Sequence, residues 1–241
     1  MEFCAEHGRF CNHSARRSIN PFLQDYTEKS VNIVGGFLGA GKTTTMNCLL
    51  SQSSSEKTDV VVREYGQAPI DDSLLNTDRE HVHVFFGASL HVDPQTMLLN
   101  YLESLYDTSI RHPFDRLLIE ASGAESAESM VQMFFLPRLR EHYHLGSYIT
   151  VVDAEYGMLN LDEFRVAREQ PAFADVIILN KIDSASGDDI DKLTCRLRRI
   201  NPCAKIIPTS FGQVSLDDVA EVTLYDQLKN VKTDEVDLEE E

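Results

Sequence analysis

The stretch Val31–Thr45, VNIVGGFLGAGKTTT, decides the fold of this chain. An apolar run ends at two glycines, and residues 36–43, GFLGAGKT, fit the pattern G-x-x-x-x-G-K-[ST] in full. Glycines let backbone N–H groups curve around phosphate oxygens without Cβ clashes, and a following helix adds the positive end of its dipole. We therefore expect a phosphate-binding loop, in which Lys42 reaches the β- and γ-phosphates and Thr43 places its hydroxyl on magnesium.

The rest of the chain alternates between apolar runs and helical patterns. The predicted strands are residues 31–35, 59–63, 81–86, 115–120, 147–152, 175–180 and 204–207. The predicted helices lie near residues 43–52, 94–106, 125–141, 157–168, 187–200 and 215–221. Continuous apolar strands, each followed by a helix, indicate an α/β fold of the P-loop NTPase kind, with a mostly parallel central sheet and helices on both faces.

Composition limits the classes of partner. The chain has 241 residues, 42% of them apolar, and a net charge of −17, which argues against nucleic acid or an anionic membrane as a partner. No apolar run approaches the length of a membrane span, and the start of the chain lacks a secretory signal. The five cysteines are an odd number, typical of reduced thiols in the cytoplasm. We predict an N-terminal extension (1–29), one P-loop domain (30–225) and an acidic, solvated tail (226–241).

A second motif indicates which base is bound. Residues 175–183, DVIILNKID, end a buried strand with Asn180, Lys181 and Asp183. The Asp183 carboxylate can accept hydrogen bonds from N1–H and the exocyclic amine of guanine, a donor pair that adenine lacks. We expect Lys181 to pack its stem along the base and Asn180 to tie this loop to the phosphate loop. Ser210, which follows the next strand, is expected in a second loop that contacts the base.

A third motif is LLIEASG, residues 117–123. A carboxylate at the tip of a strand, here Glu120, can hold magnesium through water, and the amide of Gly123 can sense a γ-phosphate. An ordinary strand-end acid is the alternative interpretation.

With these residues in place, the chain resembles the CobW-type GTPases, which belong with the HypB and UreG metallochaperones among P-loop GTPases. The resemblance runs in family order from about residue 31 to 215, and a glutamate at position 120 in place of the usual aspartate is typical of this group. The motifs that carry it are GGFLGAGKTTTMNCLL, VVREYGQAPIDDSLL, LLIEASGAESAESM, VVDAEYG, QPAFADVIILNKID and INPCAKIIPTSFG.

The resemblance implies a magnesium-dependent GTP/GDP switch with slow hydrolysis, whose cycle drives delivery of a metal or a cobalamin-type cofactor to a client protein. Matching the family motif residue by residue assigns Glu120 and Gly123 to the magnesium and γ-phosphate switch, and places Glu64 near the nucleotide and a metal position. Arg63 stands where the family usually has asparagine. The residues expected to surround the phosphates are Gly36, Gly39, Ala40, Gly41, Lys42, Thr43 and Thr44.

The chain departs from the family at the metal motif. A Cys-x-Cys-Cys is expected near Gly87, but no cysteine lies between Cys48 and Cys195. His91 lies in that window and is a candidate metal ligand. His81 and His83 lie upstream on one strand face, which permits a metal site, although surface or packing histidines are the preferred interpretation. The N-terminus offers a substitute set suited to zinc, nickel or cobalt, although a tail that merely carries these residues is the preferred interpretation. This set is Cys4, His7, Cys11 and His13. The family also often continues into a C-terminal domain.

We therefore expect a cytoplasmic GTPase with Lys42, Thr43 and Glu120 as its catalytic residues, acting on a client metalloenzyme or cofactor-dependent enzyme. The cargo would be zinc, cobalt or nickel. The alternative is a regulatory GTPase that activates a client enzyme without a metal cargo. A small-molecule kinase is less favoured, because the guanine loop would then have no purpose. A nucleotide-dependent homodimer is a further expectation.

Overall fold

The computed structural model describes residues 2–4, 9–11, 28–52, 57–64, 82–86, 93–109 and 113–222, of which 2–4, 9–11, 64 and 84–86 are described by their backbone alone. The main strands are β3 (Lys29–Gly36), β4 (Thr58–Glu64), β5 (Val82–Phe86), β6 (Arg116–Glu120), β7 (Tyr143–Asp153), β8 (Val176–Asn180) and β9 (Lys205–Pro208). The helices are α1 (Lys42–Gln52), α2 (Pro94–Thr108), α3 (Ala127–Met133), α4 (Pro137–Arg140), α5 (Gly157–Glu163), α6 (Arg165–Phe173) and α7 (Gly187–Ile200).

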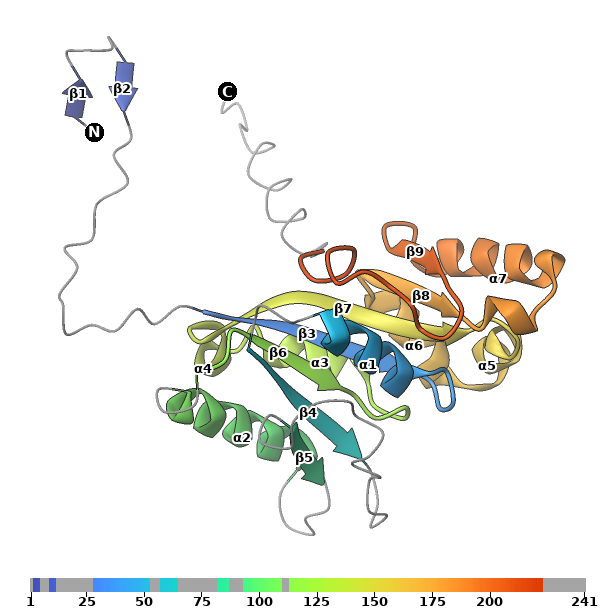
Figure 1. The fold of residues 1–241 in the computed structure, drawn as a ribbon, viewed down its shortest axis with the longest axis horizontal. Helices are drawn as coiled ribbons and strands as arrows, with labels where there is room; N and C mark the ends of the chain where they lie inside the picture. The colour runs from blue at the N-terminus through green and yellow to red at the C-terminus, as the bar shows by residue number, and fades with distance from the viewer. Residues whose placement is uncertain are drawn as a thin grey trace, which may run out of the picture.

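The seven main strands form one parallel sheet in the order β5-β4-β6-β3-β7-β8-β9 (Figure 1). This confirms the predicted fold class, and each predicted strand is present. Two further short strands, β1 (Glu2–Cys4) and β2 (Arg9–Cys11), pair antiparallel with each other in a separate two-stranded sheet. Among the described residues, none of the helices has both the length and the apolar content that a membrane span needs.

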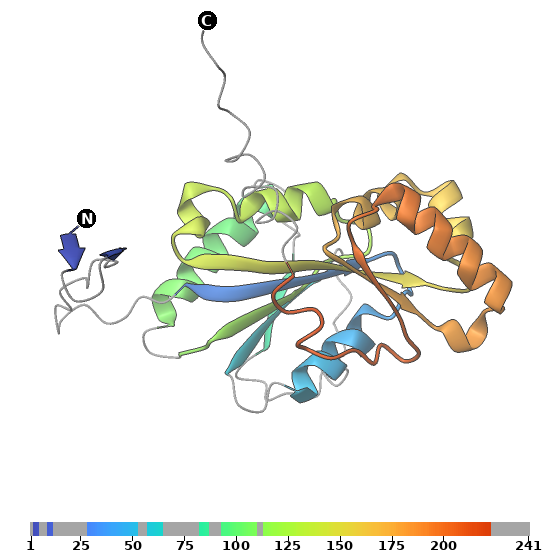
Figure 2. The same cartoon turned by 90° about the horizontal axis from the view of Figure 1, so that it is seen from above.

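Helices cover both faces of the sheet, as Figure 2 shows: α1 lies on one face, and α2, α3, α6 and α7 lie on the other. Alternate strand residues enter two separate cores. Ile33 and Ile177 pack in the core under α2–α7, whereas their neighbours Val34 and Ile178 pack in the core with Met46 of α1. Because side chains of a strand alternate between faces, burial on both faces explains why the strands are continuous apolar runs.

Two predicted helices are each interrupted. The predicted helix 125–141 is α3 followed by α4, because Leu136 precedes Pro137 and takes an extended conformation, as residues before proline prefer. The predicted helix 157–168 is α5 followed by α6, with the extended Phe164 between them. The ring of Phe164 lies 4.7 Å from that of Phe37, so the break places an aromatic side chain against the loop after β3.

The predicted helix at 215–221 is wrong, because this segment consists of turns. Side chains of the sheet donate hydrogen bonds to two backbone carbonyls of this segment. Asn32 Nδ2 donates to Ala220 O at 2.7 Å, and Ser147 Oγ donates to Val219 O at 2.5 Å. The backbone N–H of Val222 bonds to Gly146 O at 3.0 Å. These contacts satisfy the backbone as a helix would and hold the segment against the sheet.

Candidate nucleotide-binding site

The predicted motifs meet at the carboxyl edge of the sheet. The phosphate loop follows β3, Glu120 ends β6, and Asn180 ends β8. Strand β3 lies between β6 and β7, and β8 is the next strand beyond β7, so these ends lie side by side (Figure 1). Ligands of open α/β sheets bind at this edge.

A cavity of about 420 Å³ lies over the phosphate loop. Its lining includes the predicted residues Gly39, Gly41, Lys42, Thr43, Thr44, Glu120 and Gly123. Gly36 and Ala40 are buried and do not line the cavity. The cavity therefore brings together two sequence segments more than 70 residues apart, the loop before α1 and the end of β6.

Glycine is required at two positions of the phosphate loop. Gly36 has φ 138°, and a Cβ there would lie 2.3 Å from Val151 O of the adjacent strand. Gly41 has φ 101°, and a Cβ there would lie 2.4 Å from Asn180 Nδ2. Side chains at either position would clash as well as strain the backbone, so the loop shape depends on both.

The polar side chains of this cavity hydrogen-bond to the loop backbone and to each other. Lys42 Nζ donates to Gly36 O at 3.1 Å and to Phe37 O at 3.4 Å, within the loop itself. Thr43 Oγ1 donates to Glu120 Oε1 at 2.9 Å, and Glu120 is buried. The hydroxyl and the carboxylate predicted to hold one magnesium ion thus lie within hydrogen-bond distance of each other.

Gly123 contacts the phosphate loop directly. A Cβ at this position would lie 2.8 Å from Leu38 Cδ2 and 3.0 Å from Leu38 N. The turn after β6 can therefore approach the loop only because residue 123 has no side chain.

Asn180 connects three segments. Its Nδ2 donates to Ala40 O at 2.9 Å, which is the contact to the phosphate loop expected from the sequence. Its Oδ1 accepts from Gly212 N at 2.9 Å, so the loop after β9 is fixed to the same side chain. Asn180 is buried, and its amide has both a donor and an acceptor partner.

Asp153, at the end of β7, was not assigned a role from the sequence. Its Oδ2 accepts from Lys181 Nζ at 2.8 Å, and the same ammonium donates to Gly39 O at 2.8 Å. Lys181 itself is in the left-handed region, with φ 62° and ψ 36°. The buried Asp153 therefore holds the Lys181 side chain across the phosphate loop. Its position at a strand end, within VVDAEYG, was the available signal.

Asp183 is exposed and lies beside Ser210. The hydrogen bond from the Ser210 side chain, followed by a backbone hydrogen bond, lowers the pKa of Asp183 below its ordinary value. These contacts favour the charged form of the carboxylate, which is the form that accepts hydrogen bonds from two donors. The structure thus brings together the two residues expected to contact the base.

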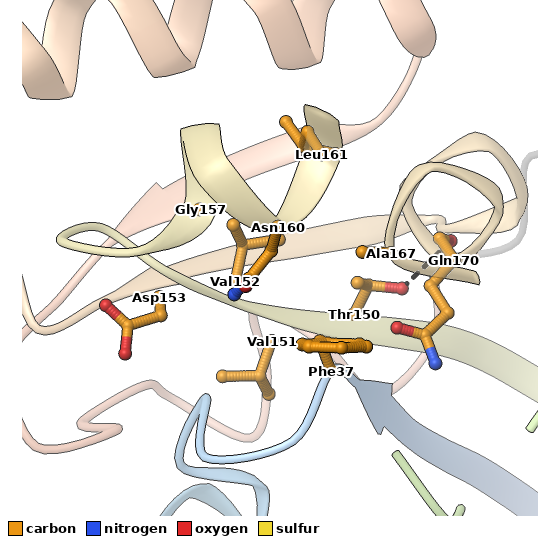
Figure 3. Close-up of a pocket in the computed structure, with 10 residues that line it drawn as sticks. All are labelled: Phe37, Thr150, Val151, Val152, Asp153, Gly157, Asn160, Leu161, Ala167 and Gln170. Atoms are coloured by element: carbon orange, nitrogen blue, oxygen red, sulfur yellow. Dashed lines mark hydrogen bonds between the residues drawn. The ribbon is translucent and has the colours of Figure 1, made fainter. Parts of the chain in front are cut away.

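The turn after Gly123 is held by α6. Gln170 Nε2 donates to Gly123 O and Glu125 O, both at 3.3 Å, and Ser126 Oγ donates to Glu169 Oε1 at 2.5 Å. Figure 3 shows Gln170 beside Thr150, whose hydroxyl donates to the Gln170 backbone carbonyl at 3.0 Å. Gln170 is fully enclosed, so it fixes this turn relative to β7; the sequence held no local signal for this contact.

The residues considered as transition-metal ligands lie largely outside the described residues. This holds for His7, His13, His81 and His91, and the side chains of Cys4, Cys11 and Glu64 are likewise outside the description. His83 is described, and its Nε2 lies 3.3 Å from Asp59 Oδ2. Within the described part of the chain, no cluster of three or more His, Cys, Asp or Glu residues could hold a metal ion.

Comparison with known proteins extends these observations. The family model described as "CobW/HypB/UreG, nucleotide-binding domain" matches residues 30–208. The zinc chaperone YjiA of Escherichia coli is 32% identical over 192 residues, covering 78% of this chain and 59% of the relative. The zinc-regulated GTPase metalloprotein activator 1 of Schizosaccharomyces pombe is 29% identical, and the match covers 84% of this chain and 50% of the relative. The zinc chaperone CobW of Pseudomonas aeruginosa is 27% identical, and the match covers 85% of this chain and 62% of the relative. The chain thus spans about half to three fifths of these relatives.

Solved structures agree with the sequence comparison. The crystal structure of Zn(II)-bound YjiA GTPase from E. coli has a TM-score of 0.61 and 29% identity, covering 81% of this chain and 62% of that one. HypB from Archaeoglobus fulgidus, at a TM-score of 0.50 and 19% identity, shares the fold. With the family model matched over residues 30–208, this chain belongs to the CobW/HypB/UreG family and contains its nucleotide-binding domain.

Proposed function

We propose that this protein binds GTP and hydrolyses it slowly to GDP and phosphate. The observation that carries the proposal is the joint position of Lys42, Thr43 and Glu120 around one cavity, with the Asn180 amide connecting that loop to the Asp183 loop. Phosphate binding and guanine recognition then share one edge of the sheet. Isothermal titration with GTP and GDP, and phosphate release over time, test this directly.

The residues at the cavity fit magnesium. Thr43 and Glu120 supply a hydroxyl and a carboxylate oxygen, the hard donors that magnesium prefers, and their oxygens already lie 2.9 Å apart. These two residues would hold the ion beside the phosphates. When bound, magnesium would neutralise part of the charge on the β- and γ-phosphates.

The chain's own residues explain why turnover should be slow. Lys42 and the loop amides would stabilise charge on the bridging oxygen between the β- and γ-phosphates. Of the described residues that line the cavity, Lys42 and Glu120 carry the formal charges, and neither arginine nor histidine is among them. We therefore propose that a partner or a second subunit accelerates hydrolysis.

Asp183→Asn should reduce the preference for guanine. The carboxylate accepts from two donors of guanine, whereas an asparagine amide can accept from one and would face the other with its own N–H groups. We expect GDP binding to weaken by about 1–3 kcal/mol, the cost of leaving a hydrogen-bond donor without its partner. Xanthine nucleotide should gain relative affinity, because it carries an oxygen in place of the exocyclic amine.

Competition titrations with GDP, XDP and ADP measure this change. Asp191→Asn is the matched control, because Asp191 is an exposed aspartate on α7 and should leave all three affinities unchanged. Unaltered selection of GDP over ADP and XDP in Asp183→Asn would contradict the role of Asp183.

We further propose that the nucleotide cycle is coupled to delivery of a metal, with zinc as the first candidate. The support is the set of relatives, since YjiA and CobW are each named as zinc chaperones. A client metalloenzyme would receive the metal. The alternative is a regulatory GTPase without metal cargo, which is favoured by the absence of cysteine between Cys48 and Cys195.

Metal titration separates these two functions. The reduced protein would be titrated with zinc, cobalt and nickel, once with GDP and once with a non-hydrolysable GTP analogue. Tight binding that changes at least tenfold with the nucleotide is expected for a chaperone, and Cys4→Ser and His91→Ala would then locate the site. Equal, weak binding of all three metals in both nucleotide states would contradict a chaperone function and support the regulatory GTPase without metal cargo.

A further inference from the structure

Phe211 lies in the loop after β9, between two residues that contact the guanine loop. Ser210 hydrogen-bonds to Asp183, and Gly212 N donates to Asn180 Oδ1 at 2.9 Å. The loop is fixed on its other side as well, because Thr209 N donates to Leu179 O at 2.8 Å. The position of the Phe211 backbone is therefore determined by the same residues that are proposed to recognise the base.

The backbone of Phe211 is unusual for an aromatic residue. Phe211 and Gly212 have φ values of 55° and 62°, and Gln213 N donates to Ser210 O at 3.3 Å. Two successive positive φ values with this hydrogen bond are typical of a type I′ turn, in which Asn, Asp and Gly are preferred at the position that Phe211 occupies. A bulky side chain here strains the turn, and such strain is concentrated at functional sites.

The side chain gains no burial in return, since Phe211 is 69% exposed. Its neighbours Thr209 and Gly212 are buried. Gly212 also cannot carry a side chain, because a Cβ there would lie 2.9 Å from the backbone of Thr45 in α1. An anchored turn thus presents one aromatic ring to solvent, directly after Ser210, whose side chain hydrogen-bonds to Asp183.

We propose that Phe211 stacks on the purine ring of the nucleotide whose base edge Asp183 recognises, and so contributes affinity without base selectivity. This inference rests on the proposed function. Asp183 would read the hydrogen-bonding edge of guanine, whereas a phenyl ring contacts the π-face, which every purine has. The two residues would therefore divide base recognition into selection by Asp183 and affinity by Phe211.

Phe211→Asn tests the proposal while preserving the turn. Asparagine tolerates the left-handed conformation, so the variant should unfold at the same temperature as the unchanged protein or higher. We expect GDP, GTP and inosine diphosphate to bind about 5- to 150-fold more weakly, by similar factors, which is the range for loss of one stacked aromatic side chain. Affinities within twofold of the unchanged protein would overturn the proposal.

A tryptophan reporter gives a second readout. The chain contains no tryptophan, so Phe211→Trp introduces a single emitter at the proposed stacking position. Its fluorescence should be quenched on addition of GDP with magnesium, whereas Phe135→Trp, placed between α3 and α4, should not respond. An unresponsive tryptophan at position 211, under conditions where GDP is bound, would also overturn the proposal.

The outcomes distinguish this inference from the proposed function. If the unchanged protein binds no guanine nucleotide, the proposed function itself fails. If it binds GDP but Phe211→Asn binds GDP equally well, only the stacking role fails. A selective loss for GDP over inosine diphosphate would show that position 211 reads base identity, which contradicts the proposed division between Asp183 and Phe211.

Discussion

Lys42→Ala should leave the chain folded but reduce GTP and GDP affinity by about 100-fold or more. Hydrogen bonds to charged groups contribute about 1.5–3 kcal/mol each, and an ammonium facing two phosphates forms at least two of them. Each 1.4 kcal/mol is a factor of ten in affinity. The contacts of Lys42 Nζ with Gly36 O and Phe37 O lie within the loop itself, so the melting temperature of Lys42→Ala should fall by a few degrees at most.

Titration calorimetry with GTP, GDP and ATP measures this effect, and thermal unfolding checks the fold. Lys192→Ala is the matched control, because Lys192 is 68% exposed on α7 and should leave nucleotide affinity unchanged. Lys42→Ala should lower the affinity for each nucleotide by a similar factor, because all of them carry phosphates. The effect of Asp183→Asn should instead depend on the base. Retained GTP affinity in Lys42→Ala would exclude this loop as the phosphate site.

The sheet could be predicted strand by strand because its signal is local. Strands buried on both faces appear as continuous apolar runs, and Val176–Asn180, with all five residues buried, is a clear example. The segment 215–221 could not be predicted in the same way. Its helical pattern is overridden by Asn32 and Ser147, which lie far away in the sequence and bond to its carbonyl groups.

The same distinction between local signals and long-range contacts applies to the candidate site. Features contained in a single motif, such as the glycines of the phosphate loop, can be predicted from the local sequence pattern. The ion pair of Lys181 with Asp153 and the hydrogen bonds of Gln170 to the carbonyls of Gly123 and Glu125 depend on the strand order, which the sequence does not state. Phe211 was visible in PTSFG, but its exposure and positive φ came only from the structure.

Arg63 and Glu125 form the second site at which we expect a large effect. They form a buried ion pair between the end of β4 and the turn that follows Gly123, with exposures of 3% and 8%. Arg63→Asn would introduce the residue that the resembling family usually has, yet it should destabilise this chain by about 3–5 kcal/mol. The reason is that Glu125 would remain buried without its charge partner, and its Oε2 already has no hydrogen-bond partner among the described residues.

The double variant Arg63→Met with Glu125→Leu separates the charge effect from packing. Apolar residues of similar volume in place of a buried ion pair are often neutral or stabilising, so most of the stability lost in Arg63→Asn should return. Urea unfolding of Arg63→Met, Glu125→Leu and the double variant measures their free energies of unfolding. The surface ion pair Lys192–Asp189 is the control: the same pair of changes there should lower the free energy of unfolding by less than about 1 kcal/mol. If the single variants are as stable as the unchanged chain, Arg63 does not compensate the charge of Glu125. If instead only the double variant recovers its stability, asparagine at position 63 is excluded in this chain because position 125 carries a carboxylate.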